Sequence, residues 1–303
     1  MEFLKVRKCN VCDLEDMVSE ILSQDARDQL ARSGQVRVDA EFDELHSLCV
    51  YVSKGITGIS IAALIRKLSL PTKESIPKEL VRAISHLRGG LILLGGAYSH
   101  NKDLTIQCLL NTVCEMNKRF ILTFGLYNTE CQQSDNSIVS SHSSSEATLD
   151  LIRHSAADLV VFGELSPNIM VLAQDCVMMG MTVILSVDSA SPSRALTRTL
   201  FMFQERETGI GFLSSYLLGI AFQVLLVTQV EDTCLYLYDF VKCDDSLLQA
   251  IKNNTISDIE CRGIVEQMNK LIEENKLVYY DVQHAFANLT NSSSVHCEDT
   301  DAF

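Results

Sequence analysis

The stretch that decides the fold runs from Gly90 to Ile106 and reads GLILLGGAYSHNKDLTI. An apolar run, two glycines and a polar turn before a helix outline a buried strand that enters a phosphate-binding loop. The loop pattern is G-x-x-x-x-G-K-[ST], in which backbone N–H groups face the phosphates, the lysine neutralises them and the hydroxyl holds magnesium. Gly96 and Lys102 occupy the first glycine and the lysine of this pattern.

Two positions of the loop depart from the pattern. Asn101 stands at the second glycine, which often needs a backbone conformation that only glycine adopts cheaply. Asp103 replaces the Ser or Thr that would bind the metal, so a carboxylate lies where an anion is expected. Taken alone, this half-motif favours a purely structural strand, turn and helix, and the rest of the chain has to decide.

The composition is that of a folded protein. The chain has 303 residues, 47% of them hydrophobic and 21% charged, which is enough for a full core and for two domains. The formal net charge is -14 and the pI is near 4.9. Because nucleic-acid binders need a basic face to displace counterions from phosphate, we expect no nucleic-acid partner.

The cysteines and the apolar runs bear on location. Eleven cysteines are scattered along a chain whose start, MEFLKVRKCN, lacks the apolar core of a signal peptide, so we expect reduced thiols and a cytoplasmic protein. Cys9 and Cys12 form one C-x-x-C pair without a second pair nearby, so no metal site is expected. The uncharged stretch from Gly209 to Gln229 is as long as a membrane span. Its serines and glutamines favour a buried helix instead.

The chain divides into regions of different periodicity. Residues 1–73 combine a helical pattern at 12–33 with alternating runs at 35–40, 45–53 and 59–68, which predicts a small α+β N-terminal domain. Residues 74–289 alternate strand and helix, which favours a mostly parallel sheet flanked by helices. The polar residues 290–303 are typical of a flexible tail.

Individual elements of the core follow from the same patterns. Strands are expected at 91–94, 119–124, 159–162, 182–187 and 234–240. Helices are expected at 78–87, 102–117, 146–155, 167–179, 192–204, 209–227, 245–253 and 257–275. The serine-rich segment 132–145 is predicted to be a loop too polar to pack.

The order of these segments resembles the secretion-type ATPases of type IV pili and type II and type IV secretion, and most closely their PilT-like pilus-retraction branch. The passages that carry the resemblance are GGLILLGGAYSHNKDLTIQCLL, KRFILTF, AADLVVFGEL, GMTVILSVDSAS and the helix-rich LLQAIKNNTISDIECRGIVEQMNKLIEENKL. The resemblance covers residues 14–289. It implies a RecA-like P-loop core with a small, truncated α+β N-terminal domain and a helical C-terminal region.

The same resemblance shows which functional positions differ. The acidic pair that positions the attacking water aligns with Gly125 and Leu126, and the phosphate-sensing histidine aligns with Asp188. The Walker B pair survives as Gly163 and Glu164, although the Arg and Asp that usually follow are Ser166 and Pro167. The strand that lends two arginines to the nucleotide aligns with residues 49–53, which carry none, while Arg66 is kept. The implied vestigial nucleotide site consists of Gly96, Lys102, Gly163, Glu164 and Arg66.

Several of these residues have two interpretations. Lys102 is either a phosphate contact or an exposed lysine at a helix start. Glu164 either holds magnesium through water or is a vestige that caps the next helix. For Asp103 and Asp188 we favour helix capping and a solvated strand end.

The leading hypothesis is a catalytically inactive paralogue of a PilT-like ATPase that acts as an assembly or regulatory subunit. It requires no cofactor and at most weak binding of ATP with magnesium. Its expected partners are proteins, namely an active pilus or secretion ATPase, a pilus platform or further copies in a hexamer, at the inner face of the membrane but without a span. The alternatives are a divergent active ATPase that uses Asp103 and Glu164 for metal, and an unrelated α/β binding protein.

Overall fold

The computed structural model describes residues 22–43, 46–55, 58–67, 71–85, 89–97, 100–116, 118–126, 137–227, 234–253, 255–256, 259 and 262–277. The chain divides into two compact units, Met1–Ser69 and Leu70–Phe303. The C-x-x-C pair, the first part of the expected N-terminal helix and the C-terminal tail lie outside the described residues.

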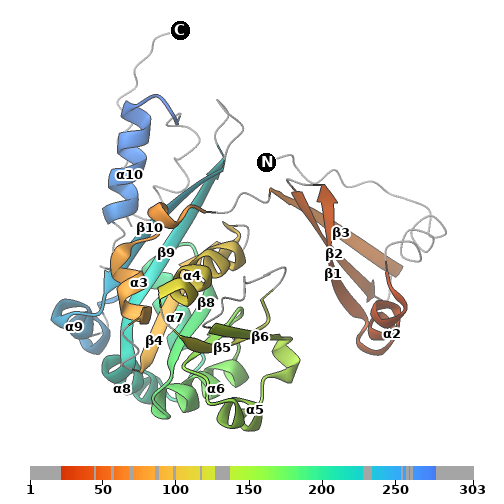
Figure 1. Cartoon of the computed structure of the whole chain (residues 1–303), viewed down its shortest axis with the longest axis horizontal. Coiled ribbons are helices and arrows are strands. Elements are labelled where there is room, and N and C mark those ends of the chain that lie inside the picture. Colours follow the sequence, from red (N-terminus) through yellow and green to blue (C-terminus); the bar gives the residue numbers. More distant parts are fainter. Residues whose placement is uncertain are drawn as a thin grey trace. The chain divides into compact units, whose positions relative to one another are not determined.

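In its described residues, the first unit has helix α2 beside a three-stranded antiparallel sheet (Figure 1). Helix α2 (Gln24–Ser33) begins at Ser23, whose side chain accepts a hydrogen bond from the Ala26 N–H, and ends at Gly34 in the left-handed conformation. The strands are β1 (Gln35–Asp43), β2 (His46–Gly55) and β3 (Gly58–Lys67), in the order β1-β2-β3. The unit's small core contains Leu22, Leu30, Val36, Val50 and Val52.

The second unit is built on a seven-stranded sheet in the order β10-β9-β4-β8-β7-β5-β6. The strands are β4 (Gly90–Gly96), β5 (Arg119–Phe124), β6 (Ser137–His142), β7 (Leu159–Phe162), β8 (Thr182–Asp188), β9 (Leu217–Val227) and β10 (Cys234–Lys242). Every pairing is parallel except the one between β9 and β10. This confirms the predicted α/β class with a mostly parallel sheet.

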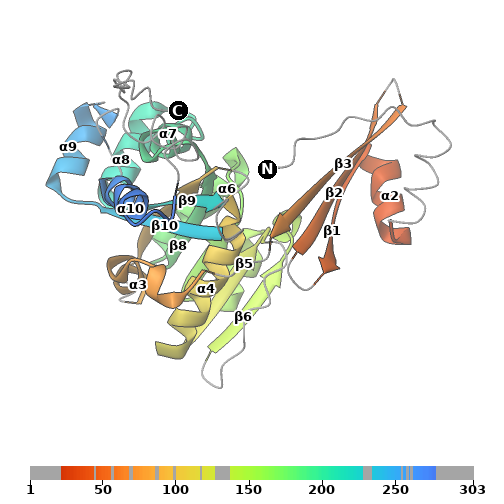
Figure 2. The same cartoon turned by 90° about the horizontal axis from the view of Figure 1, so that it is seen from above.

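Helices cover both faces of this sheet (Figures 1 and 2). They are α3 (Lys78–Ser85), α4 (Lys102–Met116), α5 (Leu149–Ser155), α6 (Pro167–Met178), α7 (Pro192–Leu200), α8 (Arg206–Tyr216), α9 (Asp245–Asn253) and α10 (Arg262–Glu273), with short 3-10 turns η1 (Lys73–Ser75) and η3 (Ser144–Glu146). Alternate residues of β4 serve the two faces. Ile92 and Leu94 pack with α3 and α4, whereas Leu91 and Leu93 pack in the larger core with α5 to α9.

The expected single helix at 209–227 is wrong. The chain forms α8 up to Tyr216 and enters β9 at Leu217 without an intervening loop. Strand β9 lies inside the sheet between β10 and β4, so both of its faces are buried and its sequence shows no period-two alternation. A short apolar run of this kind cannot be told from a buried helix by periodicity. Among the described residues, no helix has the length and apolarity needed for a membrane span.

The expectation that segment 132–145 is a loop too polar to pack is also wrong for its second half. Residues 137–142 form β6, the edge strand beside β5. The Thr123 hydroxyl donates to Ser141 Oγ at 2.9 Å, and the His142 ring stacks on Phe124 with a centroid separation of 5.5 Å. Serine hydroxyls can thus be satisfied at a sheet edge, which composition alone does not reveal.

Strands β4 and β8 are neighbours in the middle of the sheet, and the place between their carboxyl ends is called the crevice. The chain leaves β4 for α4 on one face and leaves the adjacent β8 for α7 on the other face. The carboxyl ends of two parallel strands therefore diverge at a topological switch point, which is where ligands bind in open α/β sheets. Gly96 and Asp188 are opposite each other at this point.

Candidate functional site

The two glycines at the end of β4 allow neighbouring chain to approach closely. A Cβ at Gly95 would lie 2.7 Å from Phe222 Cδ2, and one at Gly96 would lie 3.0 Å from Gln223 Cγ. The loop then enters α4 through Asn101, which has a φ of 50°. Asn tolerates this left-handed conformation better than most residues, so at the second glycine of the loop pattern it adopts a conformation that otherwise favours glycine.

Lys102 is the central residue of the crevice. Its side chain is only 6% exposed, which rules out the interpretation as an exposed lysine at a helix start. Its ammonium donates to Asp188 Oδ1 at 2.5 Å, to the Ala97 carbonyl at 3.2 Å and to the Gly96 carbonyl at 3.3 Å. A lysine ammonium has three N–H donors, and the protein's own oxygens engage all three. The group that should neutralise a phosphate is therefore already neutralised.

Asp188 is the last residue of β8 and is partly exposed to solvent, as the sequence favours, but it also has a partner that the sequence did not indicate. Its side chain is 41% exposed and forms the ion pair with Lys102. The pair forms because Asp188 and Gly96 are in register across β8 and β4, and the Ser189 N–H donates to the Gly96 carbonyl at 2.9 Å. The sequence predicts strands that end close to Gly96 and Asp188. The contact between Lys102 and Asp188 was missed because the sequence does not show that these two strands are neighbours.

A buried polar contact joins the loop before Lys102 to the neighbouring strand β9. Gln223 on β9 is fully buried, and its amide donates to the His100 carbonyl. The His100 ring contacts the Gln223 carbonyl, with 3.3 Å from Nδ1 to the oxygen. Burial lowers the pKa of His100, the Gln223 contact raises it, and the nearby charge of Lys102 lowers it further. The ring is therefore neutral at pH 7 and adds no positive charge for a phosphate.

Gly125, the position that aligns with the family's water-positioning acidic pair, is closely surrounded by neighbouring atoms. Gly125 follows β5 with a φ of 67°, and a Cβ there would lie 2.1 Å from Ser144 Oγ. A Cβ at Gly163 would in turn lie 2.3 Å from the Gly125 carbonyl oxygen. The ends of β5 and β7 thus pack backbone against backbone, and the side chain of Ser144, in the turn after β6, packs against Gly125. An acidic side chain at Gly125 has no room in this arrangement.

The remaining predicted residues occupy two places. Glu164 follows Gly163 at the end of β7 and is exposed. Its suggested capping of the next helix is wrong, because Ser166 caps α6 by accepting from the Ile169 N–H at 3.3 Å. A contact of Glu164 with magnesium stays a prediction. Arg66 lies on β3, opposite Ser47, in the other unit, and its contribution to a nucleotide site also stays a prediction.

Thiols and candidate metal ligands are distributed through the part of the chain that the structure describes. Within it, no group of three His, Cys, Asp or Glu residues is placed to hold a metal ion. Five of its cysteines are free thiols: Cys108, Cys114, Cys176, Cys234 and Cys243. Burial raises the pKa of Cys176 to about 12, so this thiol is unreactive near neutral pH.

A mostly parallel sheet with a phosphate-type loop after β4, preceded by a small helix-and-sheet unit, defines the fold of the PilT-like ATPases. Comparison with solved structures identifies this fold directly. The chain is similar to the pilus retraction motor PilT with bound ADP, with a TM-score of 0.69 and 18% identity over 90% of this chain and 83% of that chain.

Two further solved structures agree. The ATPase DotB of Yersinia pseudotuberculosis matches with a TM-score of 0.66 and 16% identity over 94% of this chain and 84% of its own. DotB of Legionella pneumophila matches with a TM-score of 0.61 and 16% identity over 95% and 83%. No model of a known protein family and no curated protein matches the sequence. The resemblance to PilT-like ATPases is thereby confirmed at the level of the fold.

Proposed function

We propose that this protein is a noncatalytic relative of the PilT-like ATPases that acts as an assembly or regulatory subunit. The observation that carries the proposal is the ammonium of Lys102, whose three donors are engaged by Asp188 and two loop carbonyls. To contact a triphosphate, this lysine has to leave a carboxylate at 2.5 Å and two carbonyls in a buried environment. The internal ion pair of Lys102 with Asp188 therefore competes with phosphate for the ammonium group.

Further groups needed for hydrolysis are replaced. Phosphoryl transfer depends on positioning and on neutralising charge. The magnesium hydroxyl is replaced by Asp103, the phosphate-sensing position by Asp188, and the water-positioning carboxylate by Gly125, which cannot accept a side chain without rearrangement. Removing one such donor in other enzymes costs on the order of a hundredfold to a thousandfold in rate. With several absent together, turnover should be negligible.

An assembly role is supported by what the chain retains. Both faces of its core sheet stay patterned for burial while the polar groups of the crevice are replaced. A fold that matches a pilus motor over 90% of its length offers surfaces on which another copy or a related motor subunit can pack. We therefore propose partnership with a pilus or secretion ATPase of the cytoplasm, in a mixed or homomeric ring.

The direct test is release of phosphate from ATP and magnesium by the purified full chain. The wild type should show no turnover above buffer. Asp188→Ala removes the internal partner of Lys102, so this variant should bind ATP more tightly than the wild type and still release no phosphate, because no base stands at Gly125. Lys102→Ala in the same background should abolish that gained binding.

Two outcomes would contradict the proposal. Steady phosphate release by the wild type that Lys102→Ala abolishes would establish the alternative, a divergent active ATPase. For the assembly role, light scattering of the chain alone and with a candidate motor subunit measures the size of the complex. A chain that stays monomeric and forms no mixed complex with that subunit would argue against partnership.

A further inference from the structure

A second cavity lies on the other side of the end of β8, beside α7. Its volume is about 580 Å³, and its lining includes Asp188, Ser189, Arg194, Arg198, Phe201 and Arg206. Pockets for small molecules usually measure roughly 300 to 1,000 Å³, so this cavity has the size of a nucleotide or a comparable ligand. It belongs entirely to the second unit.

One face of α7 supplies most of the functional side chains. Arg194, Arg198 and Phe201 follow the spacing i, i+4 and i+7, which places them on one side of the helix. The opposite side, with Leu196 and Leu200, is buried in the core. The helix is thereby fixed by its apolar face while its basic and aromatic face lines the cavity.

The charge of this cavity is opposite to that of the whole protein. The chain has a net charge of -14, yet three arginines line the cavity. Its acidic lining residue is Asp188, whose carboxylate is neutralised by Lys102. Arg198 donates through Nη1 to the Asp188 backbone carbonyl at 2.7 Å, which leaves further N–H donors on its guanidinium. Within the described residues, the side chain of Arg194 has no hydrogen bond or ion pair.

Two further residues of the lining, Ser189 and Phe201, differ in their access to a ligand. The hydroxyl oxygen of Ser189 is buried and has no hydrogen-bond partner among the described residues. This oxygen is close to Gly95, where an added Cβ would lie 3.2 Å from it, so it is not counted among the groups that contact a ligand. Phe201 follows α7 with 71% of its surface exposed, which is unusual for a large aromatic side chain and leaves its ring available for stacking.

We propose that this cavity is an anion-binding site for a nucleotide-sized phosphorylated ligand. Arg194 and Arg198 bind the phosphate oxygens, because a guanidinium matches their geometry. Phe201 stacks on the planar ring of the ligand. The site is separate from Lys102 and does not depend on whether the loop after β4 hydrolyses anything.

Isothermal titration calorimetry of the full chain with ADP and with pyrophosphate, without magnesium, tests this site. The wild type should bind both probes. Arg194→Ala and Arg198→Ala should each weaken binding of both by at least about tenfold, as loss of a charge-assisted hydrogen bond predicts. Phe201→Ala should weaken ADP and leave pyrophosphate unchanged. Arg153→Ala, which removes an exposed arginine on α5, is the matched control and should have no effect.

Thermal unfolding of each variant verifies that it is folded. The proposal fails if the folded wild type binds neither probe. It also fails if Lys102→Ala abolishes binding while Arg194→Ala and Arg198→Ala keep it, because the probes would then lie on the loop after β4. That last result would leave the cavity without a ligand and would weaken the proposed loss of nucleotide contact at the loop, so the two ideas are distinguishable.

Discussion

The crevice between β4 and β8 and the cavity beside α7 share Asp188. They differ in whether their cationic groups already have partners within the protein. On one side, the carboxylate of Asp188 and two carbonyls engage all three donors of Lys102. On the other side, the Asp188 carbonyl engages one nitrogen of Arg198, and the cavity keeps cationic donors open. At the end of β8, the cation on one side thus has all its donors engaged, whereas the guanidinium on the other side keeps donors that a ligand can contact.

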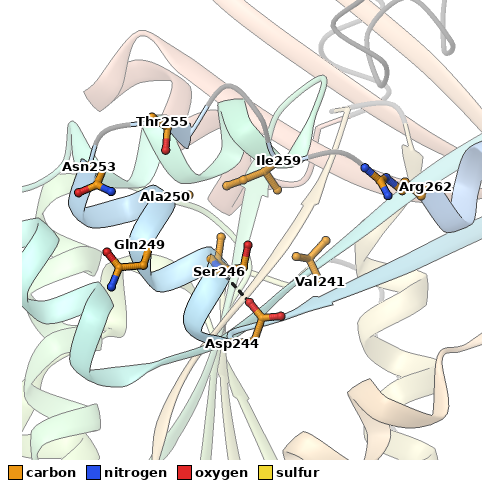
Figure 3. A pocket seen from close by; sticks show the side chains of 10 residues that line it. Val241, Asp244, Ser246, Gln249, Ala250, Asn253, Thr255, Ile259 and Arg262 are labelled. Carbon is orange, nitrogen blue, oxygen red and sulfur yellow. Dashed lines mark hydrogen bonds between the residues drawn. The ribbon is translucent and has the colours of Figure 1, made fainter.

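The difference shows how one carboxylate changes the surroundings of a lysine. Gly96 and Lys102 lie where the loop pattern predicts them, and the Asp188 carboxylate opposite Gly96 engages that lysine in an ion pair. Function in such folds resides in the polar groups at the strand ends and not in the sheet. A third pocket lies at the C-terminal side of the second unit (Figure 3).

That third pocket, of about 410 Å³, lies between α9 and the start of α10. Figure 3 shows Asp244, Gln249, Asn253 and Arg262 around it, together with the apolar Val241. Its carboxylate at Asp244 accepts from the Leu247 N–H at 2.9 Å and so belongs to the first turn of α9. A mixed lining of this kind lacks the one-sided charge of the cavity beside α7.

The largest effect is expected where the closed site has no space. Gly125→Ala should lower the free energy of unfolding by about 3 to 5 kcal/mol, because it combines left-handed backbone strain with a clash against Ser144 Oγ. Gly180→Ala is the matched control, since Gly180 also has a positive φ but nothing within 4 Å of its Cβ. Its cost should be about 1 kcal/mol. Urea unfolding of both variants measures the difference, and equal losses would show that the end of β5 can relax.

The next effect concerns the ion pair that closes the crevice. Asp188→Ala leaves a buried ammonium with only two carbonyls and should cost about 2 to 3 kcal/mol of unfolding free energy, less than a fully buried pair because Asp188 is 41% exposed. Lys102→Met should cost less, since the remaining carboxylate can be hydrated. A double-mutant cycle should give a coupling of about 1 kcal/mol or more. Additive losses would mean that the two residues do not interact in solution.

The smallest effect is a dependence on pH. Because the pKa of His100 is lowered from 6.5 in the folded state, the unfolded chain binds its proton more readily. The free energy of unfolding is therefore unaffected by His100 above pH 6.5. It decreases as the pH falls from 6.5 through the lower pKa of the folded state, because the unfolded chain takes up the proton first. Urea unfolding between about pH 5 and pH 8 should show this slope in the wild type and a reduced slope in His100→Gln. An unchanged slope would assign the proton to another group.

Sequence reasoning recovered the parts of the molecule that depend on local patterns. Strand β5 at Arg119–Phe124, strand β7 at Leu159–Phe162 and helix α9 at Asp245–Asn253 have the predicted bounds. Each of them has a strong apolar pattern and clear polar or glycine-rich flanks. Strand β9 was predicted as a helix because burial on both faces removes the alternation that distinguishes a strand.

The site could be predicted only in part, for a related reason. The half-motif located Gly96 and Lys102 correctly at the end of β4 and the start of α4. The contact between Lys102 and Asp188 joins residues far apart in the sequence and depends on β4 and β8 being neighbours. The cavity beside α7 went unnoticed, although the helical spacing of Arg194, Arg198 and Phe201 was visible in the sequence.

The direct passage from α8 into β9 has a mechanical consequence. Tyr216 ends the helix and Leu217 begins the strand, so no flexible connection can absorb a displacement between them. The N-terminal residue of α8, Arg206, lines the open cavity, and Gln223 farther along β9 holds the loop through His100. A movement of α8 along its axis would therefore displace β9, the strand that contacts the loop before Lys102.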